Sequence, residues 1–217
     1  MQARPDLVKD IYLIRHGETE YNRKGVVQGS GIDADLNELG QKQAEAFFAH
    51  YQDLPIDKIY TSALKRTHQS VKGFIDKGLP WEQHEGLNEI SWGNKEGKSP
   101  NTADDLYYKN LTKTWREGNV HVQSEEGESP VEVLERQKPV IDLILSRPEE
   151  SAILIAMHGR AMRVLLTHLF QAPLHHMDNY AHQNLCLYHL QYEYASQAFK
   201  LIKGNCVIHL ADLPESM

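Results

Sequence analysis

Strand-length apolar runs alternate with amphipathic helical segments along this chain, and this alternation limits the fold more than any other feature of the sequence. The expected strands are residues 10–15, 58–61, 152–157, 185–191 and 198–201. The expected helices are residues 37–51, 63–76, 130–145 and 160–170. Such an alternation predicts an α/β fold, a three-layer α/β/α sandwich around a mostly parallel central sheet.

Several residues mark the start of the helix expected at residues 130–145. Ser129 and Glu132 have the spacing of a capping box, and Pro130 stands at the first helical position, where a missing N–H costs no helical hydrogen bond. A second proline, Pro139, lies inside the range and removes one backbone hydrogen bond. We therefore expect a helix that begins at Pro130 and is kinked at Pro139.

The chain is expected to form one domain over residues 1–217. No internal repeat, low-complexity tract or long linker interrupts it. Residues 93–128 are rich in Gly, Asn, Lys and Glu, which predicts an inserted and partly helical segment. This insertion is interpreted either as a lid over a binding site or as a plain surface excursion.

Charge and hydropathy exclude several classes of protein. The chain has 23 Lys and Arg against 30 Asp and Glu, a formal charge of −7 that disfavours a broad nucleic-acid-binding surface. Apolar runs such as residues 152–157 are far shorter than the roughly 18 residues of a membrane span. The N-terminal residues lack a signal-peptide core, so we expect a cytoplasmic protein without nucleic-acid or membrane partners. A homodimer is left open.

Polar residues follow three of the expected strands at the point where each strand ends. Arg15 and His16 follow the first strand, Arg66 enters the helix after the second, and His158 and Gly159 follow the long buried strand. Because ligands bind beyond the carboxyl ends of parallel strands, we expect these side chains to converge. Two arginines, a protonated His158 and free helix N–H groups would form a cradle for phosphate.

His16 supplies what a nucleophile in such a cradle needs. A neutral imidazole can attack phosphorus through one ring nitrogen, provided that the other nitrogen donates to a backbone carbonyl. The product is a phosphohistidine, and its hydrolysis needs no metal because Arg15, Arg66 and His158 stabilise the phosphoryl charge. We therefore expect no metal and no other cofactor. A proton donor is also required, and the residues alone do not select it among 30 carboxylates.

The order of these motifs resembles the histidine phosphatase superfamily, with its phosphoglycerate-mutase-like fold, in the phosphatase branch. Residues 13–19 read Leu-Ile-Arg-His-Gly-Glu-Thr, which is similar to the family signature. Further segments in the family's order are residues 28–29, 36–44, 61–67, 87–90, 127–129, 157–159 and 209–210, with Asn22 and Asn205. An Arg-His-Gly triplet alone is a weak signal, whereas this ordered set is highly specific.

The resemblance assigns roles to individual residues. It implies that His16 is the nucleophile and that Arg15, Arg66 and His158 form the phosphate pocket. It implies that Glu89 is the general acid. The rival carboxylate, Glu18, is interpreted as a charge in the first helical turn that faces solvent. The remaining substrate-binding residues expected from the resemblance are Asn22, Gln28, Gly29, Gly159 and Arg160.

Two positions depart from the family's usual pattern. Arg160 stands where many relatives have a small or uncharged residue, so it either binds a second anionic group of the substrate or forms a salt bridge. His182 stands where a relative often has Asn, which leaves the substrate contacts of this loop open. With His175 and His176 it forms a histidine cluster without metal-ligand spacing, and we expect no metal site there.

These expectations favour a metal-independent phosphomonoesterase that acts on a small phosphorylated metabolite through phosphohistidine. The alternative is a cofactor-dependent phosphoglycerate mutase, the one case in which 2,3-bisphosphoglycerate would be a cofactor. The segment after Glu89 lacks the Tyr-Gly-Leu pattern and the extra basic residues usual in such mutases. A second alternative is a non-catalytic phosphate-binding module on the same fold, against which the joint presence of the site residues argues.

Overall fold

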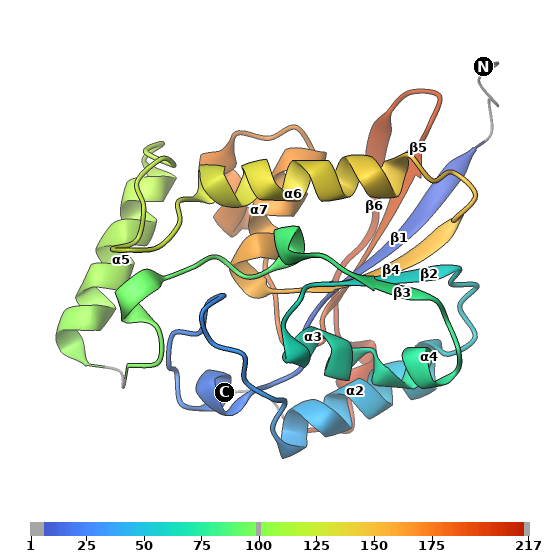
Figure 1. Ribbon diagram of the computed structural model, residues 1–217, viewed down its shortest axis with the longest axis horizontal. Coiled ribbons are helices and arrows are strands. Elements are labelled where there is room, and N and C mark those ends of the chain that lie inside the picture. The colour runs from blue at the N-terminus through green and yellow to red at the C-terminus, as the bar shows by residue number, and fades with distance from the viewer. Residues whose placement is uncertain (1–6, 99–100, 215–217) are drawn as a thin grey trace.

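Six strands form a single sheet in the computed structural model, which describes residues 7–98 and 101–214 (Figure 1). The strands are β1 Val8–Arg15, β2 Lys58–Thr61, β3 Trp81–Gln83, β4 Ala152–Met157, β5 Leu187–Glu193 and β6 Ala198–Cys206. Their order is β3-β2-β4-β1-β5-β6, and β3, β2, β4 and β1 pair in parallel. Only β5 pairs antiparallel with both of its neighbours, β1 and β6. The predicted mostly parallel sheet is confirmed; the expected domain limits at residues 1 and 217 lie outside the described residues.

Helices cover both faces of this sheet (Figure 1). The α-helices are α1 Glu20–Arg23, α2 Glu38–Tyr51, α3 Lys65–Ser70, α4 Lys72–Asp76, α5 Thr102–Arg116, α6 Pro130–Leu145 and α7 Gly159–Leu169. The 3₁₀ turns are η1 Glu85–Leu87, η2 Gly93–Lys95, η3 Leu174–Asn179 and η4 Ile208–Leu210. α6 and α7 lie on one face, and α2 and α4 lie on the other. The three-layer α/β/α sandwich is therefore the observed architecture.

Alternate residues of the two central strands supply the two halves of the core. Leu13 and Ile155 are paired in register and pack with α6 and α7, whereas Ile14 and Leu154 pack with α2 and α4. All six residues of β4 are buried. A parallel strand covered on both faces is apolar along its whole length, which explains the unbroken apolar run at residues 152–157.

Several elements differ from the expected ranges. β3 is a three-residue edge strand, too short to show an alternating pattern. The helix expected at residues 63–76 is divided into α3 and α4 at Val71, whose backbone φ of −115° is not helical. β6 continues to Cys206, well past the expected end at Leu201, because an exposed edge strand needs no apolar residues. α6 runs without interruption through Pro139 and begins with the predicted capping box at Ser129.

The insertion at residues 93–128 contains α5 and is anchored to the core. The Trp115 side chain is fully buried, and its indole Nε1 donates to the Val122 carbonyl at 2.7 Å. Its ring lies 5.7 Å from the ring of Trp92. These contacts fix α5 against the end of the molecule that carries the carboxyl ends of β1 and β4 (Figure 1). Within the described ranges, no helix is both long enough and apolar enough to cross a membrane.

Candidate active site

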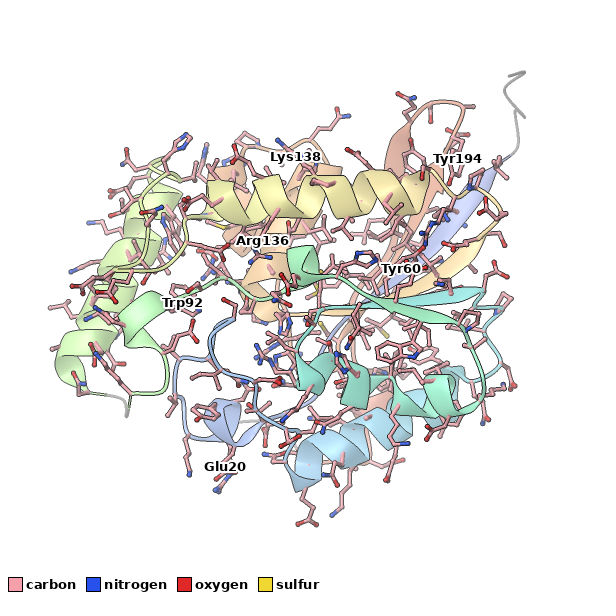
Figure 2. All side chains as sticks on the ribbon, in the orientation of Figure 1. Glu20, Tyr60, Trp92, Arg136, Lys138 and Tyr194 are labelled. Atoms are coloured by element: carbon pink, nitrogen blue, oxygen red, sulfur yellow. The ribbon has the colours of Figure 1, made fainter. Side chains whose placement is uncertain are left out.

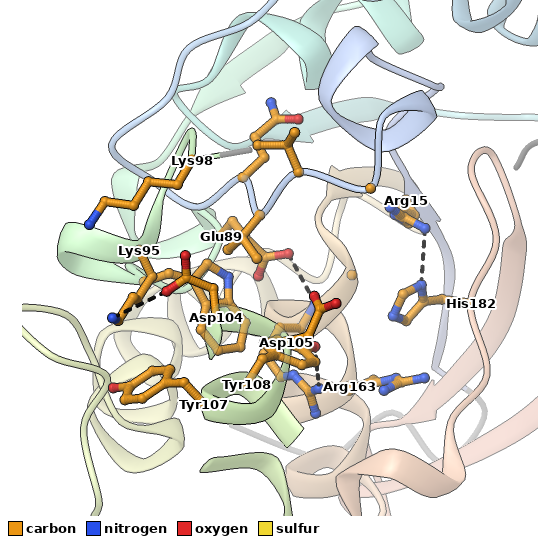
Figure 3. Close-up of a pocket in the computed structure, with 17 residues that line it drawn as sticks. Arg15, Glu89, Lys95, Lys98, Asp104, Asp105, Tyr107, Tyr108, Arg163 and His182 are labelled. Carbon is orange, nitrogen blue, oxygen red and sulfur yellow. Dashed lines mark hydrogen bonds and ion pairs between the residues drawn. The ribbon is translucent and has the colours of Figure 1, made fainter. Parts of the chain in front are cut away.

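A cavity of about 450 Å³ lies where β1 ends and α7 begins, and the insertion forms one of its walls (Figure 3). Arg15, at the end of β1, and Gly159, at the start of α7, are among the residues that line this cavity. Six further residues that line the cavity belong to the insertion, and sequence reasoning did not identify them. Their position after Glu89 could have suggested them. They are Lys95, Lys98, Asp104, Asp105, Tyr107 and Tyr108.

The imidazole of His16 is held in one tautomer, and His16 is not among the described residues that line the cavity. Its Nδ1 lies 2.7 Å from the Gly17 carbonyl oxygen, and because a carbonyl can only accept, Nδ1 must carry the proton. The lone pair is then on Nε2. Burial, followed by the neighbouring Arg66 and Arg15, lowers the pKa of His16 well below its ordinary value. The ring is therefore neutral at neutral pH, as the sequence-based mechanism requires.

His158 lies beside His16, with ring centroids 5.1 Å apart. Arg66 Nε donates to His158 Nδ1 at 3.2 Å, so the ring proton is on Nε2, which donates to Ser62 Oγ at 2.8 Å. Burial and the charge of Arg66 lower the pKa of His158 well below its ordinary value. The expected protonated His158 is therefore wrong for this state of the protein, because its closest charged neighbour is a cation. The positive charge of the site comes from the arginines.

Arg66 is fully buried and fixed to the loop that carries Gly29. Its Nη1 donates to the Ile32 carbonyl at 2.6 Å and its Nη2 donates to the Gly29 carbonyl at 3.1 Å. Gly29 is not among the described residues that line the cavity. A side chain at Gly29 would overlap with the carboxylate of Glu96. The structure thus gives Gly29 a supporting position, with its carbonyl on Arg66, where the resemblance implied a substrate contact.

Two donors in the cavity wall are buried without a hydrogen-bond partner among the described residues, Arg15 Nε and Gln28 Nε2. The amide of Gln28 is oriented by Thr19, whose Oγ1 donates to Gln28 Oε1 at 2.7 Å. A buried donor without a partner costs about 1 to 3 kcal/mol. An anion in the cavity would accept hydrogen bonds from both groups and remove this cost.

Asn22 forms hydrogen bonds within the turn that follows His16. Its backbone N–H and Oδ1 form the capping box of α1 with Thr19, and Oδ1 also accepts from Asn184 Nδ2 at 3.2 Å. Asn184 Nδ2 donates in addition to the His16 carbonyl at 3.0 Å. Asn22 is not among the described residues that line the cavity. In this structure it therefore supports the turn around His16.

The carboxylate of Glu89 lies on the cavity wall and caps the N-terminus of α7 (Figure 3). Its Oε1 accepts from the backbone N–H of Ala161 at 2.8 Å and of Ile90 at 2.9 Å, and its Oε2 accepts from the Arg160 N–H at 3.0 Å. The first N–H groups of a helix have no partner within the helix, so they are free to hold this carboxylate. The structure therefore brings Glu89 to the same cavity as Arg15 and Gln28.

Arg136, which is labelled beside α6 in Figure 2, holds the backbone that carries Glu89. Its Nη2 donates to the Glu89 carbonyl at 2.9 Å, and its Nη1 donates to the Gly86 and Asn88 carbonyls at 2.9 Å each. Its Nε donates to the Glu128 carboxylate at 2.8 Å. Sequence reasoning did not find Arg136, because its partners are distant in the chain and their backbone carbonyls carry no sequence signal.

Glu18 is buried, and the expectation that it faces solvent is wrong. Its side chain is 2% exposed, and its Oε1 accepts from Asn37 Nδ2 at 2.7 Å. The backbone N–H of Asn37 also donates to the Glu18 carbonyl at 2.9 Å, because the N-terminus of α2 packs on this turn. Glu18 is not among the described residues that line the cavity with Glu89.

Arg160 forms a salt bridge, which is one of the two roles expected for it from the sequence. Its Nη1 lies 2.5 Å from Asp178 Oδ1, and its Nη2 donates to the Tyr108 hydroxyl at 3.2 Å. The guanidinium stacks over the Trp115 ring at 5.6 Å. Arg163 shares the same Asp178 oxygen at 2.7 Å. Arg160 lines the cavity, but its charge already has a carboxylate partner and ties α7 to α5.

His182 is a cavity residue that sequence reasoning did not assign. Its Nδ1 lies 3.2 Å from Arg15 Nη1 (Figure 3). His182 stands where relatives often have Asn, and this difference could have indicated a role in the site. His175 and His176 in η3 contact each other edge to face, with ring centroids 4.2 Å apart, and are not among the described lining residues. Within the described part of the chain, no group of three His, Cys, Asp or Glu is arranged to hold a metal ion.

Comparison with known proteins identifies relatives of this chain. The model of the histidine phosphatase superfamily (branch 1) matches residues 11–204. The probable phosphoglycerate mutase GpmB of Erwinia tasmaniensis is 31% identical over 167 residues, which cover 75% of each chain. A probable phosphatase of Schizosaccharomyces pombe is 28% identical over 163 residues, covering 74% of this chain and 73% of that one.

Solved structures show the same fold. A mycobacterial glucosyl-3-phosphoglycerate phosphatase in complex with VO3 superposes with a TM-score of 0.80 at 25% identity, covering 92% of this chain and 100% of that chain. The α-ribazole phosphatase of Shigella flexneri superposes with a TM-score of 0.78 at 23% identity, covering 91% and 96%. With its ordered motifs, its sheet topology and this family match, the chain belongs to the histidine phosphatase superfamily.

Proposed function

We propose that this protein is a metal-independent phosphomonoesterase that hydrolyses a small phosphorylated metabolite through a phosphohistidine at His16. The observation that carries the proposal is the fixed tautomer of His16. Its Nδ1 donates to the Gly17 carbonyl at 2.7 Å, so Nε2 keeps the lone pair that attacks phosphorus. The lowered pKa of His16 keeps this lone pair available at neutral pH.

The reaction proceeds in two displacements. The phosphoryl oxygens accept hydrogen bonds from Arg15 Nε and Gln28 Nε2, the two buried donors without a partner among the described residues. His16 Nε2 forms a bond to phosphorus while the bond from phosphorus to the substrate oxygen breaks, and a protonated Glu89 transfers its proton to that oxygen. A water molecule, deprotonated by Glu89, then attacks phosphorus. The bond to His16 breaks, and inorganic phosphate leaves.

His158 and Arg66 change partners when the anion arrives. A phosphoryl dianion beside His158 favours the protonated form of its imidazole, because an opposite charge stabilises it. Protonation at Nδ1 ends the hydrogen bond from Arg66 Nε, which is 3.2 Å long in this structure. The guanidinium and the imidazolium can then both donate to the phosphoryl group. The neutral His158 seen here is on this account the resting state.

A screen of phosphorylated metabolites for phosphate release tests the proposal. Turnover should persist after exhaustive treatment with EDTA, because arginines neutralise the phosphoryl charge in place of a cation. Vanadate should inhibit by taking the five-coordinate geometry at His16; the structural relative solved with VO3 supports this expectation. Loss of turnover in EDTA that added metal restores would contradict the metal-independent mechanism.

A phosphoglycerate mutase is the second candidate function, because one relative at 31% identity carries that name. The two activities differ in where the phosphoryl group of His16 goes, to water or back to the substrate. With 3-phosphoglycerate, a mutase forms 2-phosphoglycerate and depends on 2,3-bisphosphoglycerate, whereas a phosphatase releases phosphate without it. Phosphate binding with neither product would instead support a non-catalytic module.

A further inference from the structure

The guanidinium of Arg15 is held from one side by His182. Arg15 Nη1 donates to His182 Nδ1 at 3.2 Å, and both residues line the cavity (Figure 3). The guanidinium is planar and rigid, so fixing Nη1 also fixes the direction of Nε. Arg15 Nε is one of the buried donors that have no partner among the described residues. The contact with His182 thus determines where this donor points.

His182 is itself held in place by the start of α7. A side-chain carbon at Gly159 would lie 2.8 Å from His182 Cε1, so the imidazole rests directly on the backbone of Gly159. Burial, followed by the charge of Arg15, lowers the pKa of His182 to about 2. The ring is therefore neutral at neutral pH, and its Nδ1 can accept from Arg15.

A neutral acceptor has a consequence for anion binding that a carboxylate would not have. An Asp or Glu beside Arg15 would form an ion pair and cancel its charge before a ligand arrives. An imidazole orients the guanidinium and leaves its full positive charge for the ligand. Arg160 is the contrast within the same cavity, because Asp178 already pairs with it at 2.5 Å.

We propose that His182 is a positioning residue for phosphate binding, which aims Arg15 Nε at the phosphoryl group through the hydrogen bond from Arg15 Nη1 to His182 Nδ1. The proposal rests on the proposed function only in taking a phosphoryl group as the anion. His182 acts through Arg15 and needs no contact with the substrate. Its effect should therefore appear in the affinity for phosphate more than in kcat.

Three substitutions of His182 separate orientation from packing. His182→Leu keeps bulk but removes the acceptor. His182→Asn places an amide oxygen near the position of Nδ1, whereas His182→Gln places it near the position of Nε2. Calorimetry with inorganic phosphate gives the dissociation constant, and steady-state kinetics with para-nitrophenyl phosphate gives kcat and KM separately.

We expect His182→Leu to weaken phosphate binding by about tenfold and to raise KM more than it lowers kcat, since a charged hydrogen bond is no longer aimed. His182→Asn should restore binding close to the wild-type value, and His182→Gln should not. The matched control is His176→Leu in η3, an exposed histidine outside the cavity lining, which should bind phosphate like the wild type. Thermal melting of each variant shows whether it folds.

Wild-type phosphate affinity in a folded His182→Leu variant would overturn the proposal. So would a His182→Asn variant as weak as His182→Leu, because packing on Gly159 and not the acceptor would then be the cause. Calorimetry needs no turnover. A wild-type protein that binds phosphate but hydrolyses no ester would therefore contradict the proposed function and leave the test of His182 intact.

Discussion

The environment of His16 explains how an imidazole stays unprotonated next to a site for anions. The ring is 4% exposed, and it has two arginines as neighbours before any ligand is bound. Burial disfavours the charged form, and the like charges of Arg66 and Arg15 disfavour it further. The carbonyl of Gly17 then selects the tautomer. Arg15 and Gly17 belong to the same triplet as His16, whereas the burial and the charge of Arg66 come from the fold around the residue.

The His16 ring should titrate well below pH 6.5. A lowered pKa means that the proton binds only at lower pH, so the neutral nucleophile persists through the neutral range. An NMR titration of the histidine ring signals measures this directly, with His16→Ala to assign the resonance. A His16 midpoint at or above pH 6.5 would contradict the account.

Glu89→Gln should lower kcat/KM, which reports the first displacement, by about a hundredfold to ten-thousandfold for an alkyl phosphate, the usual contribution of a general acid. The loss should be much smaller for para-nitrophenyl phosphate, whose leaving group needs no proton. Rates measured with esters of graded leaving-group pKa give the comparison. Melting curves are needed as well, because the amide would place an NH₂ group against the N–H donors of α7.

Glu18→Gln is the matched control for Glu89→Gln. It makes the same change on a carboxylate that is 2% exposed and that is not among the described lining residues of the cavity. The ratio of rates for the alkyl and aryl esters should stay at the wild-type value. If Glu18→Gln changed this ratio and Glu89→Gln did not, the acid role would belong to Glu18.

At the scale of elements, α7 organises one side of the site. Its N-terminal N–H groups hold Glu89, its first residue supports His182, and Arg160 in its first turn links it to α5 and η3. The insertion is thereby fixed relative to the cavity that it covers. A substitution in this helix should therefore lower the free energy of unfolding and should lower kcat/KM by a similar factor for every substrate.

Arg160→Ala tests this role of α7. We expect a loss of about 1 to 3 kcal/mol in the free energy of unfolding, because hydrogen bonds to Asp178 and Tyr108 are removed. The value of kcat/KM should fall by similar factors for para-nitrophenyl phosphate and for a carboxylated phosphate ester. A loss confined to the carboxylated ester would instead show that Arg160 binds a second anionic group.

The central elements could be predicted because burial leaves a strong pattern in the sequence. β1, β4, α6 and α7 all lie near their expected ranges, since each is apolar on the faces that the sheet or the helices cover. The rule that ligands bind beyond the carboxyl ends of parallel strands brought Arg15, His16 and His158 together correctly. Elements at the edges were less predictable, because β3 is too short and β6 is too exposed to need a pattern.

The rest of the site depends on contacts that no local pattern encodes. Arg136 and Glu89 are 47 residues apart, and Arg15 and His182 are 167 residues apart. His158 is neutral in this structure because Arg66 Nε donates to its Nδ1, a contact between residues 92 apart in the chain. Such facts follow only from the packed structure.

At the scale of the whole molecule, buried histidines should make the protein sensitive to acid. The pKa of His209 is lowered to about 4, chiefly by burial, and those of His16, His158 and His182 are lowered too. Below pH 6.5, the pKa of histidine in the unfolded chain, the unfolded chain binds protons that the folded chain does not. The free energy of unfolding therefore decreases as the pH is lowered. The His209 shift corresponds to about 2 to 3 kcal/mol at pH near 4.

His209→Phe should reduce this loss. It keeps an aromatic ring against Phe47 and Tyr51, which contact the imidazole at 5.2 and 5.3 Å, but it cannot take up a proton. Urea unfolding at neutral pH and at pH near 4 measures the difference, with His121→Phe at an exposed position as the control. Equal acid sensitivity in His209→Phe and the wild type would show that His209 does not contribute.

Trapping of the phosphoenzyme tests the central claim, that His16 carries the phosphoryl group. The protein is mixed with a substrate labelled in its phosphate and denatured in alkaline detergent after a few milliseconds. We predict label on the wild-type protein that is stable in base and lost in acid, as expected of a phosphohistidine, and no label on His16→Ala. Label that survives acid, or label of equal amount on His16→Ala, would contradict the mechanism.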